Sequence, residues 1–178
     1  DRMHQAILEI LERIGMEVHH TEAKEMLLKA GAAQNSAGRI CLGPAMLQRA
    51  LDSAPNTVPV YDREGEPAMD LGGRRAYFGT GSDLWYQIDL QTGERRISGL
   101  GDTARAARLA QALPNLDFVM TAAHASDVTP DKAYLAEVSQ IILNSVKPMV
   151  HIAKDVPDLA AMWQMACLVR GGEQEARE

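Results

Sequence analysis

The sequence predicts an α/β protein, because three different patterns follow one another along its 178 residues. Residues 1–57 carry apolar side chains at helical spacing, and residues 58–98 hold short strand-like runs between turn residues. Residues 99–178 alternate helices with strands, as the βα units of a parallel sheet do. We therefore expect an N-terminal helical cap, a small β-hairpin region leading into a first barrel strand, and the first βα units of an incomplete (β/α)8 TIM barrel.

The expected cap contains three short helices. The apolar residues of the first recur at helical spacing: Met3, Ile7, Ile10, Leu11 and Ile14. Gly15 can stop this helix in a left-handed conformation, Thr21 can cap the second helix, and Gly31 can end it. The third helix is predicted to start near Pro44, which suits a first turn, and to stop before Pro55.

The hairpin region is predicted from a change of period after residue 57. Its strand-like runs are Val58–Tyr61, Ala68–Leu71, Arg75–Phe78 and Leu84–Asp89. Turn residues such as Gly72-Gly73 separate these runs, which predicts short strands and hairpins. If Arg75–Phe78 is the first barrel strand, three βα units are present.

The last region is predicted to continue the parallel sheet. Its elements are helix Asp102–Leu113, strand Asp117–Met120, helix Pro130–Asn144, strand Met149–Ile152 and helix Val156–Arg170. Asp102, Asp155 and Thr129-Pro130 are the expected helix starts. The expected buried stripes are Leu135, Val138 and Ile142 in one helix and Leu159, Trp163 and Ala166 in another. Because a complete barrel takes roughly 250 residues, we expect it to be left open.

Composition excludes several classes of protein. The net charge of −6 and the pI near 5.4 leave no basic footprint for nucleic acid, and no stretch is long and apolar enough for a membrane span. The two cysteines, Cys41 and Cys167, lie far apart without metal-ligand spacing, which fits a reducing cytoplasm. Because the first residue is Asp1, we expect a fragment or processed part of a longer gene product.

A glycine-containing loop, Gly79-Thr80-Gly81-Ser82-Asp83, directly follows a predicted strand. Parallel α/β sheets bind ligands in such loops, which makes this loop a candidate substrate-binding segment. It matches neither a dinucleotide fingerprint, because Leu84 stands where the third glycine would be, nor a P-loop. The alternative interpretation is a tight turn that needs positive φ.

Aromatic residues are few, at 4% of the chain, yet Tyr77, Phe78, Trp85 and Tyr86 flank this loop. Aromatic faces bind ammonium groups through cation–π attraction, so a methylammonium site could form here. The alternative is that these side chains fill the core. Since side chains alternate along a strand, only one of Tyr77 and Phe78, and one of Trp85 and Tyr86, should face a barrel cavity.

Two further segments place polar groups at the same expected rim. His124 and Asp127 follow strand Asp117–Met120, and His151 lies near the end of the next strand. These groups could position a substrate or relay a proton, although a structural role in the loop or core is the alternative for each. No set of His and Cys residues has metal-ligand spacing, so the sequence predicts no metal site.

Five segments, in order, resemble the trimethylamine methyltransferase family. They are Tyr61–Gly65, Tyr77–Asp83, Asp89–Arg96, Leu113–Met120 and Asn144–Pro148. The resemblance spans nearly the whole chain and would match the first third to two fifths of such an enzyme. It implies a (β/α)8 barrel that moves a methyl group from a methylated amine, such as trimethylamine or glycine betaine, to the Co(I) form of a corrinoid.

The resemblance also implies that the corrinoid (cobalamin) is carried by a separate partner protein, so that no cofactor is bound directly. Pyrrolysine occurs in a later part of some relatives, at a position outside this sequence. The substrate would be a small methylated amine, and a homo-oligomer is compatible with the family. The catalytic residues stay unknown from the sequence.

Two alternatives remain open at this point: a truncated product that binds a methylamine or a partner without catalysis, and another α/β enzyme that binds a phosphorylated ligand at Gly79–Gly81. For the leading hypothesis we predict that Gly79–Asp83 and His124–Asp127 lie on one rim, since consecutive parallel strands end on the same side. We also predict that Asp83 offsets the charge of the bound methylammonium group.

Overall fold

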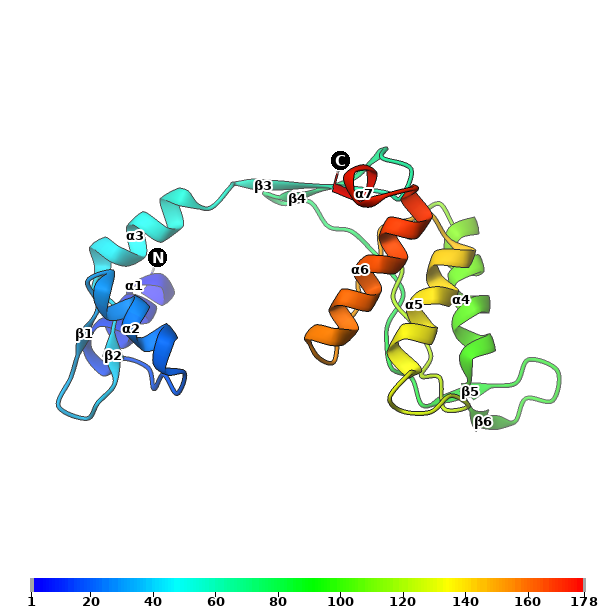
Figure 1. Cartoon of the computed structure of the whole chain (residues 1–178), viewed down its shortest axis with the longest axis horizontal. Helices are drawn as coiled ribbons and strands as arrows, with labels where there is room; N and C mark the ends of the chain where they lie inside the picture. The colour runs from blue at the N-terminus through cyan, green and yellow to red at the C-terminus, as the bar shows by residue number, and fades with distance from the viewer. Residues whose placement is uncertain (1, 178) are drawn as a thin grey trace. The chain divides into compact units, whose positions relative to one another are not determined.

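The computed structural model describes residues 2–177 and divides the chain into two compact units, residues 1–56 and 57–178. Figure 1 shows the order of the helices and strands along the chain. The structure is a mixture of α and β elements, as predicted. None of the helices in the described part of the chain combines the length and apolarity that crossing a bilayer requires.

The first unit contains helices α1, η1, α2 and α3 and a short hairpin. The bounds are α1 Arg2–Glu9, η1 Ile10–Ile14, α2 Thr21–Lys29, β1 Ala33–Gln34, β2 Ile40–Cys41 and α3 Pro44–Ser53. The predicted first helix is therefore split. Its end widens to a π-helical turn, in which the Gly15 N–H donates to the Ile10 carbonyl at 2.9 Å, and Gly15 ends it at φ 69°.

The second helix is capped differently from the prediction. The cap is His20, whose Nδ1 accepts from the Ala23 N–H at 3.3 Å, and Thr21 is the first helical residue. The hairpin β1–β2 was not predicted because its strands are only two residues long. Ile40 in β2 is fully buried, whereas Met3 of the predicted apolar stripe on α1 is 73% exposed.

The second unit opens with two antiparallel hairpins. The first pairs β3 Thr57–Tyr61 with β4 Pro67–Gly72, and the second pairs β5 Tyr86–Ile88 with β6 Arg95–Ile97. The predicted strand Leu84–Asp89 is thus shortened, and its partner β6 was not predicted. The turn between β3 and β4 also docks on two later helices, because the Arg63 guanidinium donates to the Ile142 carbonyl and the Arg170 guanidinium donates to the Arg63 carbonyl at 2.9 Å.

Helices dominate the rest of this unit. They are α4 Leu100–Ala112, α5 Ala133–Asn144, α6 Val156–Arg170 and α7 Glu173–Arg177. Helix α5 contacts both α4 and α6, and Figure 1 shows the three helices side by side. The core lies between α4, α5 and the segment that precedes the 121–127 loop, and its buried members are Ala107, Ala110, Val119 and Ile141.

The expected parallel sheet is reduced to single contacts between neighbouring segments. Gly79 pairs with Phe118 and Val119 pairs with Met149, both in parallel orientation. The predicted strands Arg75–Phe78, Asp117–Met120 and Met149–Ile152 therefore keep their expected order and direction without forming extended strands among the described residues. This arrangement is α/β, and a TIM barrel remains an expectation.

Three predicted details of the helices are wrong. Asp102 is not the N-cap of α4 but its third residue, whose carboxylate accepts from the Gly99 N–H at 3.0 Å. Helix α5 starts at Ala133, because Thr129–Lys132 forms a turn instead of a cap. The α6 stripe is not buried, since Leu159 is 58% and Trp163 is 37% exposed. Asp155 is the N-cap of α6, as predicted, and accepts from the Asp158 N–H at 2.9 Å.

Candidate functional site

The loops that follow the first two parallel segments lie side by side. The Ala122 N–H donates to the Gly81 carbonyl at 2.8 Å, and the His124 N–H donates to the Leu84 carbonyl at 3.0 Å. The Asp83 N–H also reaches the Thr121 hydroxyl at 3.4 Å. The predicted common rim of Gly79–Asp83 and His124–Asp127 is therefore confirmed.

Thr80 and Gly79 fix the first loop against the second segment. The Thr80 hydroxyl accepts from the Met120 N–H at 2.7 Å and donates to the Met120 carbonyl at 3.0 Å. The hydroxyl thus satisfies both backbone groups of Met120, which a neighbouring strand would satisfy in a regular ladder. This substitution explains why the strand pairing stops here. Gly79 lies directly over the Phe118 ring, and a Cβ at this position would collide with that ring. Both residues hold the loop rather than face a ligand.

Three ligand-type side chains converge at this rim. One donor atom from each of Asp83, His124 and Glu137 lies within 4.8 Å of the others. His124 Nδ1 is 3.3 Å from Glu137 Oε1, which also accepts from the Ala125 N–H at 2.8 Å. Glu137 is fully buried, whereas Asp83 is exposed at the mouth of the group. The rim thus combines two carboxylates and an imidazole.

Glu137 was missed by the sequence interpretation, which read α5 only as an apolar stripe. One feature of the sequence could have indicated Glu137: it is a carboxylate next to Val138, which belongs to the predicted buried face of the helix. Burial raises the pKa of Glu137, and the nearby Asp83 charge adds to this effect. The Ala125 N–H and His124 oppose the rise, because both stabilise the ionised carboxylate.

His151 occupies the end of the third parallel segment. Burial lowers its pKa, while the backbone of Tyr134 and the charge of Asp83 oppose this shift. The His151 ring meets the Tyr134 ring edge-on at 5.7 Å, and its Nε2 is buried with no hydrogen-bond partner among the described residues. Burial of the ring therefore disfavours the protonated form of His151, while the Asp83 charge favours it.

The four predicted aromatic residues have different environments. Trp85 is 59% exposed and stacks on His124 with ring centroids 4.3 Å apart, so it alone of the four contacts the carboxylate–imidazole group. The Tyr77 hydroxyl bonds to the backbone of Asp70, and the Tyr86 face is covered by the Arg95 guanidinium at 3.6 Å. Phe78 is 67% exposed. Only Trp85 is thus placed to offer a free aromatic face at the site.

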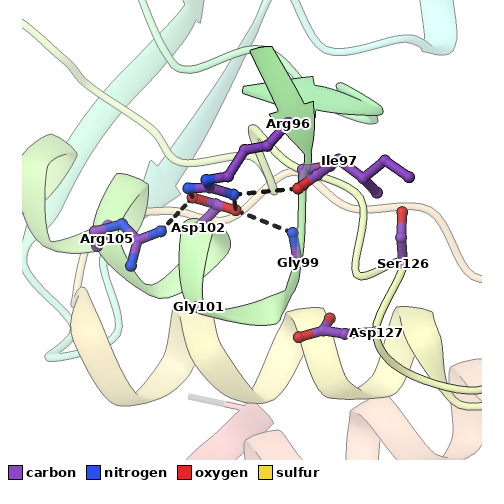
Figure 2. A pocket seen from close by; sticks show the side chains of 9 residues that line it. Arg96, Ile97, Gly99, Gly101, Asp102, Arg105, Ser126 and Asp127 are labelled. Carbon is purple, nitrogen blue, oxygen red and sulfur yellow. Dashed lines mark hydrogen bonds and ion pairs between the residues drawn. The ribbon is translucent and has the colours of Figure 1, made fainter. Parts of the chain in front are cut away.

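A hollow of about 420 Å³ lies beside the start of α4. Figure 2 shows the guanidinium groups of Arg96 and Arg105 converging on Asp102. The Arg96 guanidinium holds the pKa of Asp102 well below its ordinary value. Asp127, predicted as a binding residue, accepts from the Leu100 N–H at 2.7 Å and so caps α4. The charged groups of this hollow are paired with one another and stabilise the start of the helix.

Comparison with known proteins identifies the family of this chain. A family model described as trimethylamine methyltransferase (MTTB) matches residues 1–178. The chain belongs to the trimethylamine methyltransferase family.

Two curated relatives support this membership. Trimethylamine methyltransferase MttB of Desulfitobacterium hafniense (strain DSM 10664 / DCB-2) is 28% identical over 180 residues, which cover 99% of this chain and 36% of that protein. A glycine betaine methyltransferase of Desulfitobacterium hafniense (strain Y51) is 27% identical over 180 residues, covering 99% of this chain and 37% of the relative. The chain thus spans little more than a third of the length of these methyltransferases.

Within this member of the trimethylamine methyltransferase family, the predicted site residues separate into two groups. Asp83, Trp85, His124 and His151 gather at one rim. The others tie the loops and hairpins together through the contacts described above, namely Gly79, Thr80, Tyr77, Tyr86 and Asp127. The backbone of Gly81 accepts from Ala122 and so belongs to the same frame.

Proposed function

We propose that this protein takes part in moving a methyl group from a methylated amine to the Co(I) form of a corrinoid carried by a separate protein. The observation that carries the proposal is the family match over residues 1–178, with one relative named for trimethylamine and another for glycine betaine. The rim around Asp83 is the part of the chain best suited to the cationic head that both kinds of substrate present.

Charge is the first argument for an ammonium site at this rim. Asp83 and Glu137 bring two carboxylates to one place, and burial lowers the pKa of His151, which disfavours a positive charge on its ring. A cation entering beside Asp83 gains Coulomb energy, which is larger near protein than in bulk water. The same cation would stabilise the ionised form of Glu137, whose burial otherwise disfavours it.

The second argument is the aromatic face of Trp85. Its ring is fixed against His124 on one side and remains 59% exposed. An ammonium group over an indole face gains about 0.5–2 kcal/mol through cation–π attraction. Asp83 and Trp85 together can therefore orient an N-methyl group that carries no hydrogen-bond donor.

Methyl transfer asks the protein for geometry rather than for a covalent nucleophile. The partner's Co(I) corrinoid would supply the electron pair that bonds to the methyl carbon, while the C–N electron pair leaves with a neutral amine. The task of this chain is then to hold the ammonium group in line and to keep water from it. The hydrogen bonds from the 121–127 loop to Gly81 and Leu84 make the rim rigid enough for that task.

A second candidate function is binding of a methylamine or of a partner without catalysis. It is favoured by the exposed positions of Asp83 and Trp85, which can contact an amine without any transfer step. In that case the rim would still bind amines, but no methyl group would move. Binding and transfer therefore have to be measured separately.

The test has two arms. The purified protein is mixed with a reduced corrinoid protein and either trimethylamine or glycine betaine, and transfer is followed through the visible absorption of the corrinoid. Binding of each amine is measured by calorimetry for wild type, Asp83→Asn and the exposed hairpin control Glu94→Gln. We expect Asp83→Asn to weaken binding roughly fivefold, as expected for a partly solvated ion pair, and Glu94→Gln to have no effect.

Binding without transfer would select the second candidate. Equal amine affinity of wild type and Asp83→Asn would remove Asp83 from the site. Absence of both binding and transfer for either amine would contradict the proposal.

A further inference from the structure

Asp83, His124 and Glu137 form a group that the amine-binding proposal does not fully explain. Their donor atoms lie within 4.8 Å of one another, although the residues come from the 79–83 loop, the 121–127 loop and α5. The cluster is thus assembled by tertiary structure and not by neighbours in sequence. Carboxylate oxygen and imidazole nitrogen are both common ligands of Zn²⁺.

The separation of His124 and Glu137 suits two ligands of one metal ion. His124 Nδ1 lies 3.3 Å from Glu137 Oε1. Ligands bound at ~2.0–2.1 Å in tetrahedral geometry stand ~3.3–3.4 Å apart. A direct charge-assisted hydrogen bond between the same atoms would be shorter, at about 2.7–2.9 Å. The observed gap is long for a charge-assisted hydrogen bond and matches the spacing of two ligands around one ion.

One carboxylate oxygen of Glu137 lacks a partner, and a metal ion would supply one. The side chain is fully buried, and its Oε2 has no hydrogen-bond partner among the described residues. A quaternary ammonium group such as that of glycine betaine offers no hydrogen to this oxygen, and trimethylammonium offers only one. A divalent cation can instead bind the carboxylate directly, and its charge matches the two carboxylates of the cluster.

The surroundings hold these side chains in place for an ion. The Ala125 N–H orients the Glu137 carboxylate at 2.8 Å, and Trp85 packs on the His124 ring with centroids 4.3 Å apart. Asp83 adopts the left-handed backbone conformation, with φ 57°, which is uncommon for a residue other than glycine. Outer-shell contacts of this kind fix the direction of metal ligands.

We propose that Asp83, His124 and Glu137 bind one divalent transition-metal cation, with Zn²⁺ as the best match to one imidazole and two carboxylates. Three protein ligands leave a fourth position open to solvent or to a small ligand. This inference goes beyond the proposed methyl transfer and does not rest on it. Because Asp83 is shared, the metal ion and a methylammonium group compete for the site.

The experiment is a calorimetric titration of the purified, chelator-treated protein with ZnCl₂ in the absence of any amine. Wild type is compared with Asp83→Asn and His124→Gln, and the controls are His4→Gln and Glu94→Gln, which remove an exposed imidazole and an exposed carboxylate elsewhere. Titration with CoCl₂ adds a spectroscopic readout, since intense visible bands report four-coordinate Co²⁺ held by protein ligands.

We expect one equivalent of Zn²⁺ to bind to wild type and to both controls. Asp83→Asn and His124→Gln should each weaken binding at least about 10-fold, because loss of a ligand costs no less than loss of an outer-shell contact. The visible Co²⁺ bands should disappear in both variants. Glu137→Gln removes the third ligand, and its metal affinity is interpreted only if its circular dichroism and melting temperature match those of wild type. If Glu137→Gln unfolds, the metal affinity of Asp83→Asn, which changes an exposed residue, tests the inference.

Two results would overturn the inference. The first is a wild-type protein that binds no stoichiometric Zn²⁺ or Co²⁺ at concentrations of about 100 μM, a weak limit for an assembled three-ligand site. The second is unchanged affinity in both Asp83→Asn and His124→Gln. Because no amine is present, neither result depends on whether the methyl-transfer proposal holds.

Discussion

Lys147 is predicted to be a major stabilising residue of the second unit, and Lys147→Met tests this. Its ammonium group donates to three backbone carbonyls, those of Ala110 and Leu113 at 2.7 Å each and that of Leu116 at 2.6 Å. These carbonyls lie at the end of α4 and just after it, where the Ala110 and Leu113 carbonyls accept only long bonds of 3.3 Å from the Leu113 and Leu116 N–H groups. The positive charge also interacts favourably with the negative end of the helix dipole.

The expected loss follows from these contacts. A hydrogen bond to a charged group contributes about 1.5–3 kcal/mol to stability. The sum of three such bonds overestimates the contribution of Lys147 to the free energy of unfolding. Two effects reduce it: Lys147 is only half-buried, so water can replace part of the interaction, and ordering its side chain costs up to about 2 kcal/mol. We therefore expect Lys147→Met to lower the free energy of unfolding by about 2–3 kcal/mol, a change of roughly 30- to 150-fold in the equilibrium constant.

Urea unfolding followed by tryptophan fluorescence is the suitable assay. Both tryptophans of the chain, Trp85 and Trp163, belong to the second unit, so the signal reports on that unit even if the first unfolds separately. Lys132→Met removes an exposed ammonium group from the same unit and should change stability by less than about 0.5 kcal/mol. The reasoning is refuted if Lys147→Met unfolds at the same urea concentration as wild type, or if Lys132→Met is equally damaging.

Two other predictions concern the rim. Because burial lowers the pKa of His151, the unfolded chain binds a proton more readily than the native one, so stability should fall as the pH drops below the ordinary histidine value of about 6.5. His151→Gln should flatten this part of the stability–pH curve, and a curve unchanged by the substitution would contradict the assignment. Thr80→Val removes the hydroxyl that serves both Met120 backbone groups and should cost about 1–3 kcal/mol in the same urea assay, whereas Thr80→Ser, which retains the hydroxyl, should lose much less.

Local periodicity predicted most of the helices and hairpins of this fold. Strands β3 and β4 and helix α4 were expected within a few residues of their observed bounds, because alternation and helical spacing are properties of short segments. The exact starts of α4 and α5 were less predictable. Asp102 is a residue type typical of N-caps, but Gly99 is the N-cap of α4, so Asp102 lies in the first turn of the helix.

The parallel segments show what local sequence could not predict. Their direction and order were expected, but the length of pairing depends on partners far along the chain. At Thr80 a side-chain hydroxyl replaces a backbone partner, and at Pro148 the chain has no N–H to donate, so extended ladders do not form. Neither effect leaves a periodic signal in the sequence.

The candidate site was only partly predictable for the same reason. Asp83 and His124 follow predicted strands, and this position alone made them candidates. Glu137 lies within a helix, more than ten residues from His124, so no motif of metal or catalytic spacing could include it. Asp127 illustrates another limit, because its carboxylate accepts from the Leu100 N–H at the start of α4, a contact far along the chain that the sequence did not indicate.

The way the 121–127 loop is held determines which substitutions can separate structure from chemistry. Ser98 donates to the carbonyls of Leu84 and His124, and Thr103 donates to that of Ala123, so these side chains bond to backbone and fix the path of the loop. The side chain of His124 takes no part in these contacts. Its replacement, like that of the exposed Asp83, should leave these backbone contacts in place, and His124→Gln also removes the ring that packs on Trp85. Glu137 serves both purposes, since the same oxygen that approaches His124 also accepts from the loop backbone. A change in function at Glu137 therefore carries information about the site only when the Asp83 and His124 variants, which spare the loop, change in the same direction.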